Sequence, residues 1–454
     1  LIERIMTNHS ESLEMFLQRH PDTEVLEVML LDLVGGWRGK WVGREKMDFV
    51  VAGEMKLPHS TLAFDSWGRD LEAWVFETGD CDAICIPDLS TLVPVPWADR
   101  PTAQMMVSLQ EIDGTDSRID PRNILKHQID RLADIGYFPV VACEMEFFLL
   151  SLEQDSLGRP IHTQTDRVGG RMSAGQTYGL EIMGDMSTFV HALRDAAKVQ
   201  GLPLDALIKE SAPSQYEVNL KYSSNALVAA DQAAMLQRLI RGVAQSQDLL
   251  ATFMAKPFGN IAGSGFHMHC SLLDEAGNNV FSDDSPSGSS LLRKAVGGCL
   301  DSLKDCMLLF APNLNSYRRF QTKSHAPLSP SWGYENRTAA IRIPASDPSA
   351  TRLEHRVSGA DVNPHLAVSG FLAAIYRGIQ EGIDPPDPIV GNAYDHLDNS
   401  LPCYWPDALH FFEKSTVIRE SFGEQFQKIF SLVKRQEMAE FDCQVTPLEY
   451  DTSL

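Results

Sequence analysis

The stretch Gly263-Ser264-Gly265-Phe266-His267-Met268-His269-Cys270-Ser271-Leu272 places two histidines two residues apart, directly after a glycine-rich approach. Side chains of a β-strand alternate between its two faces, so His267 and His269 would share one face. The glycines before them leave room for a backbone or an anionic ligand to come close. The stretch therefore predicts a strand that presents two imidazoles to one site.

A second, strongly apolar stretch carries acids in the same pattern. Residues 137–150 read Tyr-Phe-Pro-Val-Val-Ala-Cys-Glu-Met-Glu-Phe-Phe-Leu-Leu, so Glu144 and Glu146 would also share a strand face. Buried like charges repel each other unless something neutralises them. A hard divalent cation does so well, because it prefers carboxylate oxygens and tolerates an imidazole. The two stretches together predict a metal site.

Three further segments also embed ionisable residues in apolar, strand-like runs. They hold Glu210 with Glu217, Arg319 with Arg337 and Arg342, and Arg352 with Glu354 and Arg356. A single charge in such a run is usually a structural ion pair, but five such segments in one chain make that interpretation insufficient. Acids and arginines that converge on one site indicate metals and phosphates together.

The 454 residues exceed one ordinary core, and the sequence divides near residues 110–118. Residues 1–115 read as short strands and proline-rich extended chain, which predicts a small, mainly β domain. In residues 116–454, Asp120-Pro121 opens a helix that Gly136 ends. Long helices are expected at 226–256 and 364–380, with short charged strands between them. This pattern predicts an α+β catalytic domain and not an alternating βαβ array.

The formal net charge of −22 argues against nucleic acid and anionic membranes as partners. No apolar run reaches membrane-spanning length, and no secretory signal opens the chain. The 8 cysteines are scattered without zinc-like pairs. Such a distribution fits reduced thiols, so we expect a cytoplasmic protein.

Six motifs in this order resemble the glutamine synthetase family over nearly the whole chain. They are Glu144-Met-Glu-Phe-Phe, Glu210-Ser-Ala-Pro-Ser-Gln-Tyr-Glu217, Gly263-Ser-Gly-Phe-His-Met-His269, Pro312-Asn-Leu-Asn-Ser-Tyr-Arg-Arg319, Asn336-Arg-Thr-Ala-Ala-Ile-Arg342-Ile-Pro, and Arg352-Leu-Glu-His-Arg356. The resemblance implies a β-grasp-like N-terminal domain before a larger catalytic domain of antiparallel strands and helices. It also implies a homo-oligomer, a dodecamer of two stacked rings with active sites between neighbouring subunits.

The resemblance also implies a role for each matching residue. Two or three divalent ions, Mg²⁺ or Mn²⁺, would be held, one by Glu146, Glu210 and Glu217, another by Glu144, His267 and Glu354. ATP would be the co-substrate, contacted by His269, Ser271, Arg342 and Arg352, with Arg337 on the transferred phosphate. Gly263, Arg319 and Arg356 would hold glutamate. The γ-phosphoryl group would pass to the γ-carboxylate, and an amine would attack the resulting acyl phosphate.

The chain departs from ammonia-using members where ammonium is bound. Their flap reads Tyr-Glu-Ala-Pro, whereas residues 321–327 here place His325 at the position of the glutamate. Their Asp-Gly-Ser-Ser segment is also missing, and its nearest counterpart, residues 63–68, contains Asp65. Ala262 replaces an asparagine. Losing two carboxylates removes most of the acceptors around a small cation.

We therefore expect a ligase that joins glutamate to a larger primary amine, with a polyamine favoured and a small monoamine next. His325 would either accept the proton of the amine or merely line the flap, and both interpretations stay open. Tyr178 and Asp65, the latter from a neighbouring subunit, are candidates for the amine site. Residues 392–395 resemble a segment that some family members adenylylate, which makes Tyr394 a candidate for modification.

Three alternatives remain at this stage. The first is an ordinary ammonia-using glutamine synthetase whose flap is shifted in register. The second is a catalytically inactive ring-forming sensor or structural protein, which the retained metal and arginine positions argue against. The third is phosphoryl transfer to a guanidino group.

Overall fold

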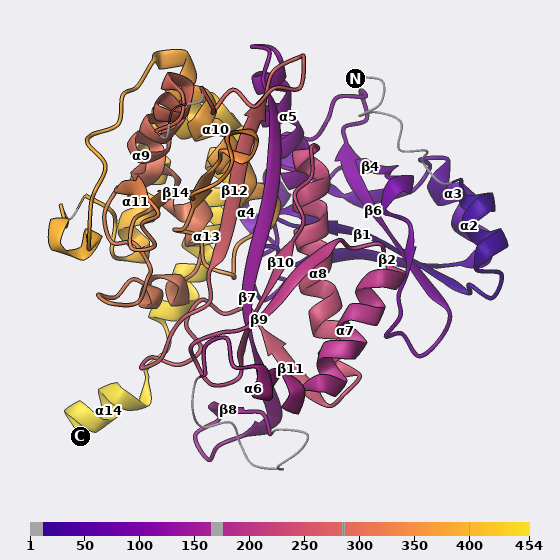
Figure 1. Cartoon of the computed structure of the whole chain (residues 1–454). Coiled ribbons are helices and arrows are strands. Elements are labelled where there is room, and N and C mark those ends of the chain that lie inside the picture. The colour runs from indigo at the N-terminus through magenta and orange to yellow at the C-terminus, as the bar shows by residue number, and fades with distance from the viewer. Residues whose placement is uncertain (1–11, 165–175, 284, 286, 399) are drawn as a thin grey trace.

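Two β-sheets organise the chain in the computed structural model, which describes residues 12–164, 176–283, 285, 287–398 and 400–454 (Figure 1). The first sheet lies within residues 25–110 and has the strand order β2-β1-β6-β4-β3, with β5 beside β6. Its strands are β1 (Val25–Leu31), β2 (Trp37–Gly43), β3 (Lys56–Pro58), β4 (Asp82–Pro87), β5 (Val93–Pro94) and β6 (Thr102–Gln110). β1 and β6 run parallel, and the other pairs are antiparallel. Short helices accompany this sheet, namely α2 (Leu13–Arg19), α3 (Met47–Val51) and α4 (Glu72–Thr78).

The second sheet has the order β13-β14-β15-β12-β7-β10-β9, and β8 and β11 also pair with β7. Its strands are β7 (Phe138–Gln154), β8 (Pro160–His162), β9 (Leu204–Lys209), β10 (Gln215–Leu220), β11 (Leu249–Thr252), β12 (Phe266–Leu273), β13 (Trp332–Tyr334), β14 (Ile341–Ile343) and β15 (Leu353–His355). These strands pair antiparallel except β13 with β14. The long central strand β7 carries the acids that the sequence singles out.

The helices that follow β6 belong to the larger part of the chain, and several of them pack on the second sheet. They are α5 (Pro121–Ala133), α6 (Leu180–Asp185), α7 (Ser187–Val199), α8 (Ala226–Gln245), α9 (Ser290–Phe310), α10 (Pro364–Glu381), α11 (Trp405–Lys414), α12 (Thr416–Phe422), α13 (Glu424–Asp442) and α14 (Pro447–Ser453). In Figure 1, α9, α10 and α11 lie to the left of β7, and α7 and α8 lie to its right, toward the first sheet. Among the described residues, none of the helices combines the length and apolar character needed to span a bilayer.

The predicted helix starts are confirmed at two N-caps. The side chains of Asp120 and Asn363 each accept backbone N–H bonds from the first turns of α5 and α10. The helix predicted at 226–256 is wrong at its end, because α8 stops at Gln245 and residues 249–252 form β11. Asp248, whose φ of 56° is left-handed, turns the chain between them. The 21-residue helix α9 was not predicted.

The predicted linker near residues 110–118 is a tight turn. Glu111 N–H donates to Thr115 O at 2.7 Å, and Gln110 bridges Asp116. The following Asp120 carboxylate also accepts the Leu109 N–H at 2.7 Å. These bonds tie β6 directly to α5.

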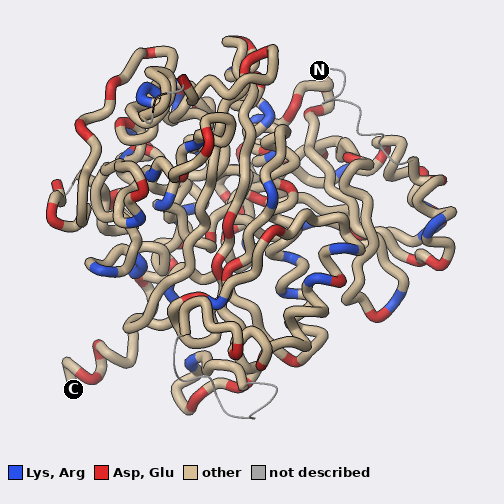
Figure 2. The backbone as a smooth tube through the Cα atoms, in the orientation of Figure 1, with Lys and Arg blue, Asp and Glu red and all other residues tan. Residues whose placement is uncertain are grey.

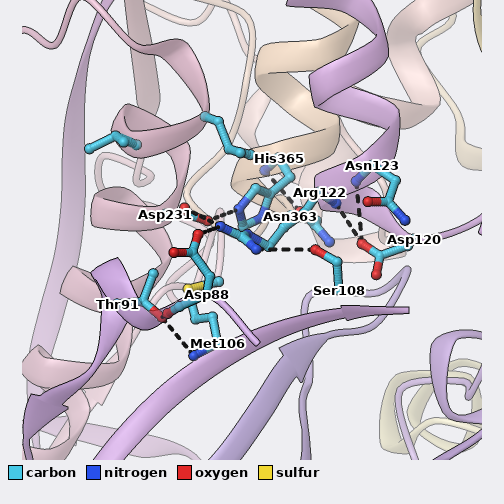
Figure 3. A network of polar contacts seen from close by, with 12 residues as sticks. Asp88, Thr91, Met106, Ser108, Asp120, Arg122, Asn123, Asp231, Asn363 and His365 are labelled. Atoms are coloured by element: carbon cyan, nitrogen blue, oxygen red, sulfur yellow. Dashed lines mark hydrogen bonds and ion pairs between the residues drawn. The ribbon is translucent and has the colours of Figure 1, made fainter. Parts of the chain in front are cut away.

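A buried ion network fastens the first sheet to three helices of the larger part (Figure 3). Arg122 of α5 donates from Nε and Nη2 to the two carboxylate oxygens of Asp231 in α8, both at 2.8 Å. Its guanidinium also reaches Asp88 at 2.6 Å and Ser108 at 3.1 Å, both from the first part. His365 Nε2 of α10 lies 2.7 Å from Asp231 Oδ1. Buried apolar side chains from both sheets form one continuous core around it.

Candidate active site

The acidic centre is built by strand register. β7 pairs with β12 so that Glu144 lies opposite His267, and with β10 so that Glu146 lies opposite Glu217. Glu144 Oε1 lies 3.0 Å from His269 Nε2, and Glu144 Oε2 lies 3.5 Å from His267 Nδ1. Because strand side chains alternate, the two histidines share a face, as the sequence predicts, and both reach the same acid. Figure 2 shows the acidic segments, in red, gathered on neighbouring strands near the middle of the molecule.

Glu354 extends the centre on β15, where it lies opposite both His269 on β12 and Arg342 on β14. Its side chain is buried between two guanidinium groups: Arg342 Nη1 lies 2.8 Å from Oε2, and Arg356 contacts Oε1. Burial opposes ionisation, but nearby positive charge, chiefly that of Arg356, outweighs it and lowers the pKa of Glu354 to about 2. Arg352 Nε lies 3.4 Å from His269 Nδ1. Glu354 is therefore an anion held in place by cations.

Glu217 and Glu210, by contrast, are buried beside other carboxylates, whose negative charge opposes their ionisation. Burial raises the pKa of Glu217 to about 9, and the charges of Glu146, Glu144 and Glu210 add to the rise. Burial and the charge of Glu146 also raise the pKa of Glu210. Burial opposes ionisation of Glu144 too, but hydrogen bonds from the two imidazoles bring its pKa below the usual range. Such crowding of carboxylates is a favourable environment for divalent cations.

The donor atoms of this centre fit metal ions. Glu144, Glu217 and His267 form one group and Glu144, His269 and Glu354 another, each with ligand atoms within 4.8 Å of one another. Carboxylate oxygens with imidazole nitrogens suit Mg²⁺ and Mn²⁺. The grouping differs from the predicted one, because the register sets His269, and not His267, opposite Glu354.

The glycine-rich approach is required by close packing. A Cβ on Gly265 would lie 2.8 Å from His267 Nε2 and 2.9 Å from Arg319 Nη2. The Gly265 N–H donates to Glu146 Oε2 at 2.8 Å. A Cβ on Gly263 would lie 2.3 Å from the carbonyl oxygen of Ala255. Side chains here would displace the arginine and the histidine.

Two cavities meet at this centre. One, of about 740 Å³, lies on the side of His269, Ser271 and Arg352. The other, of about 630 Å³, is covered by the flap residues 321–325. Glu144 and Asn219 line both. The second cavity brings together Glu146, Glu210, Glu217, His267, Gly263, Arg319, Arg356, Arg337, Arg342, Tyr178 and His325.

Two predicted residues are absent from the linings of both cavities. Glu354 is buried and forms ion pairs with Arg342 and Arg356, which line the second cavity themselves. Asp65 is buried, and its carboxylate accepts bonds from Trp67 N, Arg69 N, Arg69 Nε and Gln436 Nε2 at 2.8–2.9 Å. This arrangement argues against Asp65 as a contact of the amine, because its oxygens already close the 65–69 turn and anchor it to α13.

Several lining residues escaped the sequence interpretation. Gln215 donates to Gly263 O at 2.9 Å. It lies two residues before Glu217 in β10, so strand alternation alone predicts that both side chains face the same site. Tyr222 is 76% exposed and lines the first cavity directly after β10. Lys256 lines the second cavity and contacts the carbonyl of Ile261 within the same loop. No motif marks Tyr222 or Lys256.

The flap is a tight loop with unusual backbone. His325 and Lys323 have φ of 58° and 65°, in the left-handed region that non-glycine residues seldom adopt. His325 is exposed toward the second cavity, and Arg337 lines the same cavity from another loop. Tyr394 lies beside the flap, with its hydroxyl donating to Ala326 O at 2.9 Å.

Comparison with known proteins agrees with this geometry. Residues 118–453 match the glutamine synthetase catalytic domain. The chain is 34% identical over 457 residues to gamma-glutamylputrescine synthetase PuuA of Escherichia coli (strain K12), covering 100% of this chain and 96% of that protein. It is 32% identical over 436 residues to a glutamate–isopropylamine ligase of a Pseudomonas sp, covering 93% of each.

A solved structure of a GmaS/ADP complex is similar over 97% of this chain and 99% of that one, with a TM-score of 0.84 at 26% identity. The sequence match and the structural likeness both extend through the strands that carry the acidic centre. This chain belongs to the glutamine synthetase family.

Proposed function

We propose that this chain is an ATP-dependent ligase that joins the γ-carboxyl group of glutamate to a primary amine, with a polyamine favoured and a small monoamine next. One observation carries the proposal. The acidic centre lies where two cavities meet, and the flap over the second cavity presents His325 where a carboxylate would serve ammonium. Enzymes of this family are ATP-dependent and use divalent metals.

The cavity of about 740 Å³ is proposed to take the nucleotide. Its exposed Tyr222 offers an aromatic face to a base, and Arg352, with Ser271 and His269, lies toward the centre where phosphates would meet cations. Its volume suits a ligand of nucleotide size. Arg342 and Arg337 approach the same centre from the second cavity.

Two or three Mg²⁺ or Mn²⁺ ions, held by Glu144, Glu146, Glu210, Glu217, His267 and Glu354, would neutralise the charge of the phosphoryl group in transfer. Arg337 is exposed on its loop and is proposed to contact that group as it moves. In this step a γ-carboxylate oxygen of glutamate bonds to the γ-phosphorus, and the bond from that phosphorus to the β-bridging oxygen breaks.

Glutamate is proposed to lie in the second cavity against Arg319 and Arg356, with its α-amino and α-carboxylate groups beside Gly263 in the cavity wall. Arg319 is buried, and its Nη1 donates to Val357 O at 2.8 Å, which fixes the guanidinium. A fixed guanidinium suits recognition of a carboxylate because little freedom is lost on binding.

The amine is proposed to enter beside the flap. Tyr178 lines the same cavity, as do the apolar side chains of Ile208 and Ile261, which suit a carbon chain. The amine nitrogen attacks the carbonyl carbon of γ-glutamyl phosphate, phosphate leaves, and His325 takes the proton that the nitrogen loses. The relatives' names span both amine classes, a diamine and an alkyl monoamine.

We also propose a homo-oligomer, a dodecamer of two stacked rings, by likeness to the family. All eight cysteines are free, which supports a reducing, cytoplasmic setting. Modification of Tyr394 stays a prediction.

A coupled ADP assay over an amine panel tests the function. With ATP, glutamate and Mg²⁺ or Mn²⁺, putrescine, spermidine or isopropylamine should support ADP formation and a matching amide by mass spectrometry, and ammonium chloride should support little. His325→Glu should raise ammonium turnover relative to amine turnover. Ammonium turnover equal to or above that with every amine would overturn the proposal in favour of an ordinary glutamine synthetase. Absence of ADP with all acceptors would favour an inactive ring protein.

A further inference from the structure

The flap depends on bonds from outside itself to keep its shape. Left-handed backbone at Lys323 and His325 costs on the order of 1–3 kcal/mol per residue, so the surroundings must hold it. Inside the loop, the Ser324 hydroxyl lies 2.5 Å from Gln321 O and 3.2 Å from Arg319 O, and it accepts the Ala326 N–H at 3.2 Å. These bonds shape the turn and join it to the chain just before it.

Tyr394 supplies an external anchor. It belongs to a short 3₁₀ turn at Ala393–His396, and its hydroxyl donates to Ala326 O at 2.9 Å. Burial raises the pKa of its phenol above the usual value, while hydrogen bonds with the Ser324 side chain and the His325 backbone partly offset the rise. The phenol is therefore a neutral donor that contacts residues on both sides of the His325 side chain.

The same segment is also bonded to the loop that carries Arg337. We name residues 389–394 the strap. Asn336 Nδ2 donates to the strap carbonyls of Ile389 at 3.2 Å and Gly391 at 2.9 Å. Thr338 Oγ1 accepts the Ala393 N–H at 2.9 Å and donates to Asn336 Oδ1 at 2.7 Å. Asn336 is buried, so these bonds are shielded from water.

The strap thus joins two loops that approach the second cavity from different parts of the chain. His325 and Arg337 line the cavity, whereas Tyr394 is not among its lining residues. Its phenol is near enough to Arg319 and Arg356 for their charges to lower its pKa slightly. Tyr394 therefore lies just behind the flap and next to the proposed glutamate site without entering it.

We propose that Tyr394 is a positioning residue whose hydroxyl holds the flap over the acyl phosphate, and that the strap sets the flap relative to Arg337. The inference rests on the proposed ligase function. When the flap is held, the amine reaches the activated carboxyl group and water does not. When the phenol hydroxyl is lost, the flap opens more often, and water competes with the amine for the acyl phosphate.

Tyr394→Phe tests this against a matched control. Tyr334→Phe removes the same kind of bond elsewhere, because the hydroxyl of Tyr334, at the end of β13, donates to Ser287 O at 2.8 Å. We expect the ratio of hydrolysis to amide formation, measured as ADP formed in excess of amide divided by amide, to rise about fivefold in Tyr394→Phe, the order of one lost hydrogen bond. The KM for the amine should rise while the KM for ATP is unchanged, and Tyr334→Phe should match the wild type. An unchanged product ratio and amine KM in Tyr394→Phe would overturn the proposal.

Two further measurements keep the test decisive. Ser324→Ala removes a hydroxyl that bonds both the phenol and the flap backbone, so it should also raise the ratio of hydrolysis to amide formation. It replaces Tyr394→Phe in the test if that variant fails to fold. Hydrogen–deuterium exchange of residues 321–327 in the substrate-free protein should be faster in Tyr394→Phe than in the wild type or Tyr334→Phe. Because exchange needs no turnover, it separates failure of the strap from failure of the proposed function. Equal exchange in all three proteins would refute the positioning role even if the ligase assay succeeds.

Discussion

The ion network between the first sheet and helices α5, α8 and α10 predicts a large loss of stability for Asp231→Asn. The substitution keeps the shape of the side chain and removes its charge. Both Asp231 oxygens bind Arg122 at 2.8 Å, and Asp231 and Arg122 are 4% and 5% exposed. Arg122 would then keep only Asp88, whose side chain is 31% exposed, as an anionic partner.

Two estimates of the magnitude agree. Removing one partner of a buried pair costs about 3–5 kcal/mol, and the remaining contact to Asp88 places this case near the lower end. Burial opposes ionisation of Asp231, but Arg122 and His365 lower its pKa from 3.8 to about 2. That fall corresponds to about 2.5 kcal/mol. Because the folded pKa is depressed, this contribution is fully present above pH 3.8 and is lost as the pH falls through about 2.

Urea unfolding followed by fluorescence and circular dichroism measures the loss. The free energy of unfolding of Asp231→Asn should fall by roughly 3 kcal/mol, equally at about pH 5 and about pH 8. Glu24→Gln is the control, because its pair with Arg100 is exposed and 3.4 Å long, and it should change stability by about 0–1 kcal/mol. Arg122→Met combined with Asp231→Leu should recover part of the loss, since it removes the buried guanidinium together with the carboxylate. Recovery should be incomplete, because Asp88 and His365 each lose a partner. A loss below about 1 kcal/mol in Asp231→Asn at both pH values would contradict the reasoning.

Three other predictions concern the metal centre, the thiols and the core. Glu144→Gln should abolish detectable Mn²⁺ binding by calorimetry and lower kcat at least about a hundredfold, because Glu144 belongs to both donor groups; retained affinity would count against those groups. Iodoacetamide at about pH 8 should label the exposed Cys81, Cys403 and Cys443 in the native protein and all eight cysteines after denaturation, because burial raises the pKa of thiols such as that of Cys270. Labelling of Cys270 in the native protein, detected by peptide mass spectrometry, would contradict its buried position. Gly298→Ala should lower the free energy of unfolding, measured in urea, by about 1–3 kcal/mol, because its Cβ would lie 2.1 Å from Ala374 O where α9 crosses α10. Gly259→Ala is the control: its Cβ would meet open space, so it should change that free energy by less than about 0.5 kcal/mol.

Local spacing was enough to predict the faces of the strands and the starts of two helices. Alternation places Glu144 with Glu146 and His267 with His269 whatever the strands pair with. An Asp-Pro or Asn-Pro pair likewise starts a helix through its own side chain and ring. These features depend on residues a few positions apart, so they survive any tertiary arrangement.

Pairing and long-range contacts were not predictable in the same way. Glu354 lies opposite His269 because β12 and β15 pair in one particular register, and the residues flanking either side chain in the sequence do not reveal that pairing. The Asp65 carboxylate is likewise occupied by Gln436, a residue far along the chain. The end of α8 also lacks a glycine or proline signal, since the turn at Asp248 uses left-handed backbone in a non-glycine residue.

The two halves of the proposed chemistry rest on structures of different rigidity. Most of the proposed metal donors sit on β7, β10, β12 and β15, where a shift of one residue would turn every side chain to the opposite face. The groups proposed to receive the amine sit on the flap and on the turn of Tyr178, outside any strand. Loops accept substitution without disturbing strand register. A family with this arrangement can change its acceptor by altering loops while its activation of glutamate stays the same. Substitutions in residues 321–327 should therefore change the choice of amine more than they change the transfer of phosphate.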